Sequence, residues 1–191
     1  MPSLMRSVLR QELALGLKPA SRICLDIETG ATPEGRVYCW AVYDSDVGAV
    51  VPELDDALEG YIEGVGVRDG KEFNGEIPKK FCIHFDCGRL RYRVTAGLMS
   101  TFSRSLVNSL ASLTPEQTAQ PLRLSVRLGD RSSSGKVVLP RLVIPQTNDL
   151  DIWLGPKFEP IGSRDIDAMR TAYRQVLTVL PEIEFNGRGG A

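Results

Sequence analysis

The sequence predicts a mainly β protein with a few helices, and two patterns carry that prediction. Three segments, 78–86, 89–97 and 122–130, alternate apolar and polar residues with a period of two, as half-buried strands do. Between them, residues 100–113 change to a period of 3.6, which is typical of an amphipathic helix. The composition agrees, because 42% hydrophobic and 25% charged residues are usual for a globular domain.

Two further segments read as strands and complete a set of five. The first, 58–70, has three glycines in its interior, where glycine often marks a bend or a bulge. A turn at 72–76 joins it to the next strand. The last, 136–145, contains Pro140, which indicates a sheet edge or a bulge.

The alternation also assigns faces to the strands. In 78–86 it buries two phenylalanines and an isoleucine, and it exposes Cys82 and His84. In 89–97 it buries Leu90, Tyr92 and Val94, and it places three arginines on the exposed face.

The order of elements is three strands, one helix and two strands within about 90 residues. This order matches a five-stranded Greek-key barrel of the OB type, with a helix between the third and fourth strands. We therefore expect a central OB-type barrel over residues 56–147. A small sandwich and an SH3-like barrel also hold five strands, but neither normally places a three-turn helix at that point.

Residues 1–55 form the predicted N-terminal extension. Their apolar spacing predicts a helix over 3–16, and two strand-like segments, 22–28 and 37–44, predict a β-hairpin.

Residues 148–191 form the predicted C-terminal helical extension. Its helix covers 161–180, with Ser163 as the predicted N-cap and an apolar stripe that begins at Ile166. Trp153 and Phe158 precede the helix. They suit either anchors for a partner or contacts that pack the extension onto the barrel, and we expect the packing role.

Several classes of protein and site are excluded or disfavoured. No apolar run approaches the ~18 residues of a membrane span, and charges interrupt the N-terminal apolar pattern where a signal peptide would have none. Four sparse cysteines are then most simply reduced thiols in the cytoplasm. His84, the one histidine, rules out sites with two histidines, and its spacing to Cys82 and Cys87 matches no common zinc finger. No motif calls for a cofactor.

Several features of the middle segment occur together: a strand beginning Gly60-Tyr61, a glycine-containing turn with a nearby lysine, a strand pair, and a helix with the pattern Arg104-Ser105-Leu106-Val107-Asn108-Ser109-Leu110. With these features, residues 57–147 resemble the OB-fold single-stranded DNA-binding proteins of phages. The resemblance implies a non-enzymatic protein of DNA replication or repair. The acidic C-terminal tail of bacterial single-strand binders is absent from this sequence.

The basic residues of the middle segment supply a candidate binding surface. Residues 56–147 hold 13 basic and 9 acidic residues, an excess of four, although the whole chain has a net charge of −1. Successive arginines at a period of two lie some 7 Å apart, a spacing that can follow a phosphate backbone. The expected nucleic-acid-binding residues are Arg89, Arg91, Arg93, Arg123 and Arg127 at the phosphates, Lys79, Lys80, Arg131 and Lys136 at the entrance, and Phe73 and Tyr61 as stacking platforms.

The expected ligand is single-stranded DNA bound with little sequence preference, and RNA is left open. One alternative is a protein-interaction module whose partner, or a second copy of the chain, docks on the terminal helices. Another is a metal-dependent nuclease, because Asp26 and Glu28 resemble the first carboxylate pair of the DEDD-type exonucleases. The later acidic residues lie too close in sequence to complete that fold, so the nuclease ranks third.

Overall fold

The computed structural model describes residues 12–16, 40–44, 49–53, 57–88, 91–128, 138–146 and 150–184. In chain order the elements are β1 (Glu12–Gly16), β2 (Trp40–Asp44), β3 (Ala49–Glu53), β4 (Ala57–Asp69), β5 (Lys79–Asp86), β6 (Arg91–Gly97), α2 (Thr101–Leu110), α3 (Pro115–Thr118), β7 (Leu122–Leu128), β8 (Val138–Ile144), β9 (Ile152–Trp153) and α4 (Ile166–Val176). No described helix is long and apolar enough to span a membrane.

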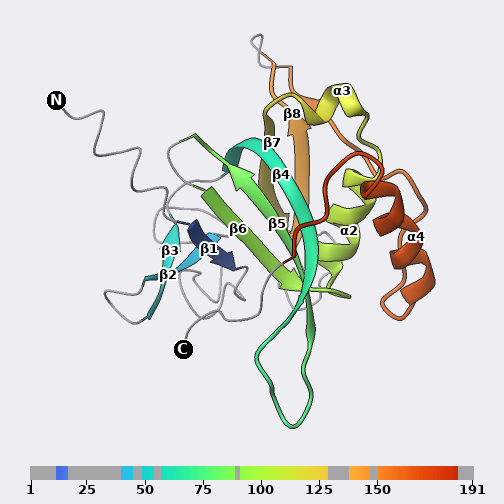
Figure 1. Ribbon diagram of the computed structural model, residues 1–191. Coiled ribbons are helices and arrows are strands. Elements are labelled where there is room, and N and C mark those ends of the chain that lie inside the picture. Colours follow the sequence, from blue (N-terminus) through green and yellow to red (C-terminus); the bar gives the residue numbers. More distant parts are fainter. Residues whose placement is uncertain are drawn as a thin grey trace, which may run out of the picture.

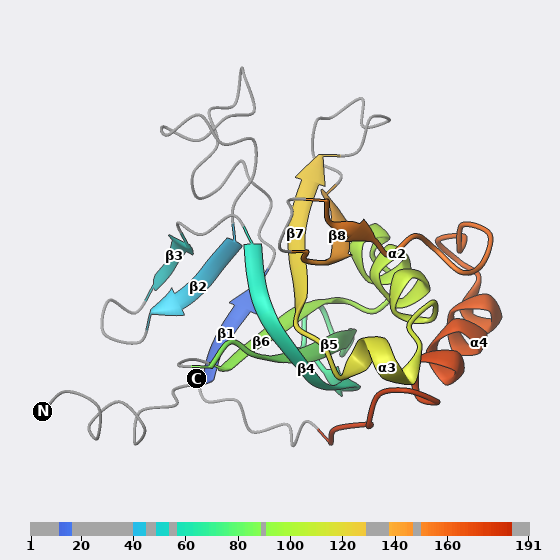
Figure 2. The same cartoon turned by 90° about the horizontal axis from the view of Figure 1, so that it is seen from above.

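The molecule is mainly β, with one sheet of nine described strands in the order β3-β2-β1-β6-β5-β4-β7-β8-β9. All neighbouring strands run antiparallel except β1 and β6, which are parallel. Figure 1 shows β1–β3 on one side of the central strands and the helices α2 and α4 on the other. The turned view of Figure 2 shows the same separation.

The five predicted strands are confirmed as β4 to β8, and α2 lies between the third and fourth of them. A closed barrel is not confirmed. Among the described residues β6 and β8 do not pair, and the outer edge of β6 is taken by β1. The described sheet also has more than the five strands expected for the barrel, because β1, β2 and β3 extend it at one end and β9 extends it at the other.

The long strand β4 bends as its glycines predict. Its register with β5 shifts between Ile62 and Gly64, so one residue bulges out of the ladder. Only the first part of β4, up to Gly60, pairs with β7. Beyond the bulge, Val65 exchanges backbone hydrogen bonds with Pro181 and Ile183, so the C-terminal segment takes over that edge.

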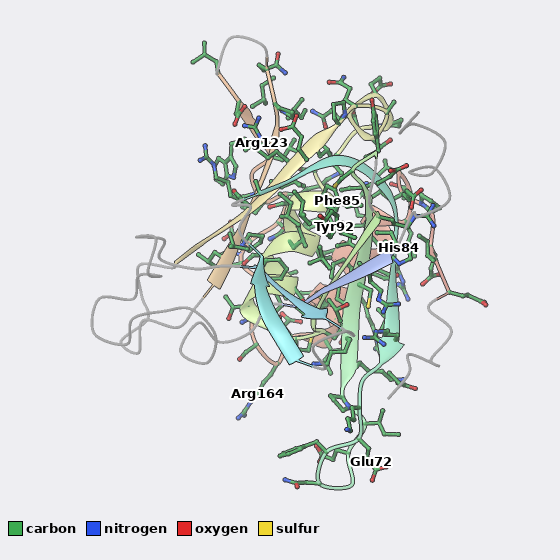
Figure 3. All side chains as sticks on the ribbon, turned by 90° about the vertical axis from the view of Figure 1, so that its left-hand side faces the viewer. Glu72, His84, Phe85, Tyr92, Arg123 and Arg164 are labelled. Carbon is green, nitrogen blue, oxygen red and sulfur yellow. The ribbon has the colours of Figure 1, made fainter. Side chains whose placement is uncertain are left out.

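The prediction that one face of β5 is exposed to solvent is wrong. Phe81, Ile83 and Phe85 are buried as expected, but Cys82 and His84 on the other face are buried as well. The reason is the central place of β5 between β4 and β6, together with the long side chains of Arg68 and Arg93, which lie close to Cys82 on that second face. Figure 3 shows Phe85 beside Tyr92, its partner across the β5–β6 ladder, in the interior.

The two longer helices complete the core. α2 begins after Ser100, whose side chain accepts from the Ser103 backbone N–H and so caps the helix. Leu106 and Leu110 of α2 are fully buried in the same apolar cluster as β4 to β8.

The C-terminal helix begins later than predicted. Its N-cap is Asp165 rather than Ser163, and the Asp165 side chain accepts from the Ala168 backbone N–H. A carboxylate at this position also interacts favourably with the helix dipole, which explains the preference. Met169 and Val176 are buried, whereas Ile166, where the predicted apolar stripe begins, is 52% exposed.

The N-terminal elements differ from the prediction where the structure describes them. Residues 12–16, the end of the expected helix, form β1, because the free edge of β6 offers them a strand to pair with. β2 lies within the predicted second hairpin strand, but its neighbours are β1 and β3. The expected partner, 22–28, lies outside the described residues.

Candidate nucleic-acid interface

One face of the strands β4, β5 and β6 collects most of the basic residues that the structure describes in this region. Cross-strand partners share a face, and the register pairs Arg91 with Asp86, Arg93 with His84, and Lys80 with Arg68. We call these residues, with Cys82 at their centre, the basic face. Arg91 and Arg93 therefore lie on a common face, as their spacing predicts.

Arg68 is a member of the basic face that the analysis of the sequence missed. Its Nε atom is buried and has no hydrogen-bond partner among the described residues. The positive charges of Arg68 and Arg93 both act on the nearby Cys82 sulfur. The signal was present in the sequence, since Arg68 continues the period-two series of Gly64 and Gly66.

Arg91 is held by a carboxylate from β4. Its Nη2 atom donates to Oε1 of Glu63 at 2.9 Å, and its Nε atom lies 2.6 Å from Oε2. The Arg91 and Glu63 side chains are 36% and 28% exposed, so this ion pair is partly shielded from water. A phosphate at Arg91 must share the guanidinium with Glu63 or displace it.

Arg123 lies apart from this cluster and is paired twice. Its Nε donates to Oε2 of Glu59 at 2.9 Å, and its Nη1 donates to Oδ2 of Asp151 at 2.8 Å. Glu59 first, and then Asp151, raise the pKa of the Arg123 guanidinium above its ordinary value. Figure 3 shows Arg123 well separated from His84 of the basic face. With two carboxylates in place, Arg123 is a weak candidate for phosphate binding.

The two predicted entrance lysines that the structure describes behave differently. Lys79 pairs with Asp69 at 2.5 Å, in a pair whose side chains are 60% and 56% exposed. Exposed pairs of this kind are worth about 0–1 kcal/mol, so an anionic ligand can replace Asp69 at small cost. Lys80 faces Arg68 on the basic face.

Both predicted stacking platforms are exposed. Tyr61 is 50% exposed and lies opposite Asp86, which itself lies opposite Arg91, so its ring flanks the basic face. Phe73 is 73% exposed in the β4–β5 turn, where Asn74 and Gly75 adopt positive φ angles. Figure 1 shows that this hairpin projects from the body of the molecule, and Figure 3 places Glu72 in it.

The structure does not describe the side chains of the other predicted binding residues. Arg89, Arg131 and Lys136 lie outside the described residues, as do Asp26 and Glu28 of the nuclease hypothesis. For Arg127 the structure describes only its backbone place in β7, opposite Leu139.

The cysteines of this region are suited to packing rather than to chemistry. Burial raises the pKa of the Cys82 thiol, and burial together with the Asp86 charge raises the pKa of Cys87 to about 11. Both are therefore neutral thiols at neutral pH, and a neutral thiol is a poor metal ligand. Within the described ranges no three His, Cys, Asp or Glu side chains are grouped as a metal site would need.

The helix pattern that carries the family resemblance has a structural role here. The Arg104 guanidinium donates to the carbonyls of Met99 and Ile161 and to the Thr101 hydroxyl. Asn108 donates to the carbonyls of Phe158 and Glu159 and accepts from the Phe158 N–H. Both side chains thus fasten the loop before α4 onto α2.

The two aromatic residues before α4, Trp153 and Phe158, differ in burial. Phe158 is partly buried and packs against the core, as expected. Trp153 lies in the edge strand β9 and is 60% exposed, so it does not pack into the core as predicted.

Comparison with protein-family models, with curated proteins and with solved structures finds no match to this chain.

Proposed function

We propose that this protein binds single-stranded nucleic acid, with DNA as the expected ligand, across the basic face of β4, β5 and β6. The observation that carries the proposal is the cross-strand register, which gathers Arg68, Lys80, Arg91 and Arg93 on one face next to the exposed Tyr61 ring. Among the described residues, four cations of this face lie near two carboxylates, Glu63 and Asp86, so basic side chains predominate there. Cations that follow the backbone and an aromatic ring that stacks a base are the usual parts of such a site.

The strand order supports an OB-type architecture for this region. In the order β6-β5-β4-β7-β8, the fourth strand returns to lie beside the first, which is the Greek-key arrangement, and α2 precedes that return. OB-folds are partly open barrels that bind oligonucleotides on strands two and three and on the loop between strands one and two. Those parts are here β5, β6 and the projecting hairpin with Phe73.

Salt dependence of binding tests the proposal most directly. We expect fluorescence anisotropy with a labelled oligo(dT) to show affinity that falls between about 50 and 200 mM salt, with a log–log slope near −0.7 per neutralised phosphate. Arg93→Ala should weaken binding and make the slope shallower by about 0.7. Arg170→Ala is the matched control, because it removes the same charge from an exposed site on α4.

A salt-independent affinity, or equal losses in the two variants, would overturn the proposal. Thermal unfolding of each variant, followed by circular dichroism, separates lost contacts from lost fold.

A second candidate is protein docking, and an apolar groove favours it. The groove has a volume of about 580 Å³ and lies between the base of the β4–β5 hairpin and α4, lined among others by Val67, Met169 and Ile166. If protein docking is the function, the oligonucleotide will fail to bind even at low salt.

A further inference from the structure

A cavity at the edge of the sheet contains features that the basic face does not use. It has a volume of about 680 Å³ and lies between α2, β8 and the segment from Trp153 to Ile161. Pockets that hold small ligands span about 300–1,000 Å³, so a nucleotide fits within it. Two arginines, Arg104 and Arg141, line it, and none of its described lining residues is an aspartate or a glutamate.

The cavity has a firm inner wall. Arg104 and Asn108 of α2 bind the backbone of the loop that forms the opposite side, at Ile161 and at Phe158 and Glu159. Asn108 is only 2% exposed, and these bonds span about fifty residues of sequence. A pocket whose walls are bonded in this way loses little entropy when a ligand enters.

The mouth of the cavity carries an indole ring and a guanidinium. Trp153 pairs with Val143, and Arg141 precedes Val143 by two residues on β8, so both side chains lie on the same face. Diagonal neighbours of this kind lie about 7–8 Å apart, within reach of long side chains. Trp153 and Arg141 are both exposed, and Arg141 forms no ion pair in the part of the chain that the structure describes.

An anion is favoured further by the helix that borders the cavity. Thr101 in the first turn of α2 lines the space, and that turn contains no acidic residue. The positive end of a helix dipole therefore adds to the charges of Arg104 and Arg141.

We propose that this cavity is a nucleotide site, in which a base stacks on Trp153 and its phosphate binds Arg141. The inference rests on the proposed function, because it makes this nucleotide part of the same bound strand. Arg123 of β7 lies in register with Val143, and Val143 lies in register with Trp153. The bound nucleic acid would therefore run from the basic face past Arg123 to reach Trp153.

Tryptophan fluorescence tests the site separately from binding. The chain has two tryptophans, so Trp40→Phe leaves Trp153 as the only one. We expect oligo(dT) to quench Trp153, whereas an abasic oligonucleotide of equal length binds by anisotropy without quenching. Trp153→Ala should weaken oligo(dT) binding by about 5- to 150-fold, the range for loss of one stacked base. Ile152→Ala, at the exposed neighbouring position, should leave the affinity unchanged.

The outcomes separate the two proposals. Normal oligonucleotide binding without quenching of Trp153 would overturn the nucleotide site and leave the proposed function intact. Quenching by adenosine 5′-monophosphate in a protein that binds no oligonucleotide would support the site and overturn the proposed function. Equal quenching by the abasic strand would also overturn the stacking role.

Discussion

Asn108 is a residue whose single side chain joins two distant parts of the chain. It is buried, and three of its hydrogen bonds go to backbone groups of Phe158 and Glu159. Removing it leaves those groups unsatisfied, at about 1–3 kcal/mol for each one that stays buried. We expect Asn108→Ala to lower the free energy of unfolding by about 2–4 kcal/mol in urea denaturation.

Ser105→Ala is the control for this prediction. Ser105 lies on the same helix and lines the same cavity, so its substitution should change the free energy of unfolding by less than about 0.5 kcal/mol. Equal losses in the two variants would show that the Asn108 bonds do not hold the loop.

At this scale the sequence indicated that Arg91 and Arg93 share a face, because alternation along one strand decides which side chains lie together. The exposure of Tyr61 and Phe73 also agrees with their predicted place at the surface. The sequence did not indicate the partners of the arginines. Glu63 meets Arg91 only because a bulge in β4 turns it there, across 28 residues of sequence. Glu59 meets Arg123 across 64 residues. Contacts at such separations depend on the tertiary fold and leave no local pattern.

At the scale of elements, the packing of β4 against its neighbours requires glycine at position 60. A Cβ atom on Gly60 would overlap the carbonyl group of Asp86 and meet the Cα of Cys87 at 3.0 Å. Since backbone atoms of a neighbouring strand cannot rotate away, Gly60→Ala should lower the free energy of unfolding by about 1–3 kcal/mol.

Gly97→Ala provides the comparison for that variant. Its Cβ would lie 3.8 Å from the nearest atom, the Ser100 Cβ, which is an ordinary contact. Thermal unfolding should therefore give a lower midpoint for Gly60→Ala than for Gly97→Ala, and the reverse order would contradict the packing described for β4.

The elements that the sequence predicted are those with a strong period. β4 to β8 and α2 each have a regular apolar face in the core, and that face is visible in the sequence, although β5 buries its second face as well. β1, β3 and β9 were missed because they have two to five residues and owe their form to a neighbouring strand. The same reason explains why the helix predicted for 3–16 gives way to a strand at residues 12–16.

At the scale of the whole molecule, several basic side chains are neutralised by carboxylates next to them, and the net charge is close to zero. The net charge is −1, and carboxylates stand beside Arg91, Arg123 and Lys79. Long-range attraction of a polyanion is therefore weak, and binding depends on short-range contacts. We expect Glu63→Gln to release Arg91, raise the affinity for oligo(dT) several-fold and steepen the salt slope by about 0.7.

Asp167→Asn makes the same change in charge at an exposed position of α4. Anisotropy titrations of the two variants at equal salt separate the local effect from the change in net charge. An equal gain in affinity would assign the effect to net charge and remove Arg91 from the binding surface.

The open sheet has a consequence for how copies of this chain behave toward one another. Its two outermost described strands, β3 and β9, are poor templates for further pairing, since β3 contains Pro52 and β9 has only two residues. Proline and short length are devices by which sheets avoid edge-to-edge growth. Both ends of the described sheet are therefore poorly suited to pairing with the sheet of another copy.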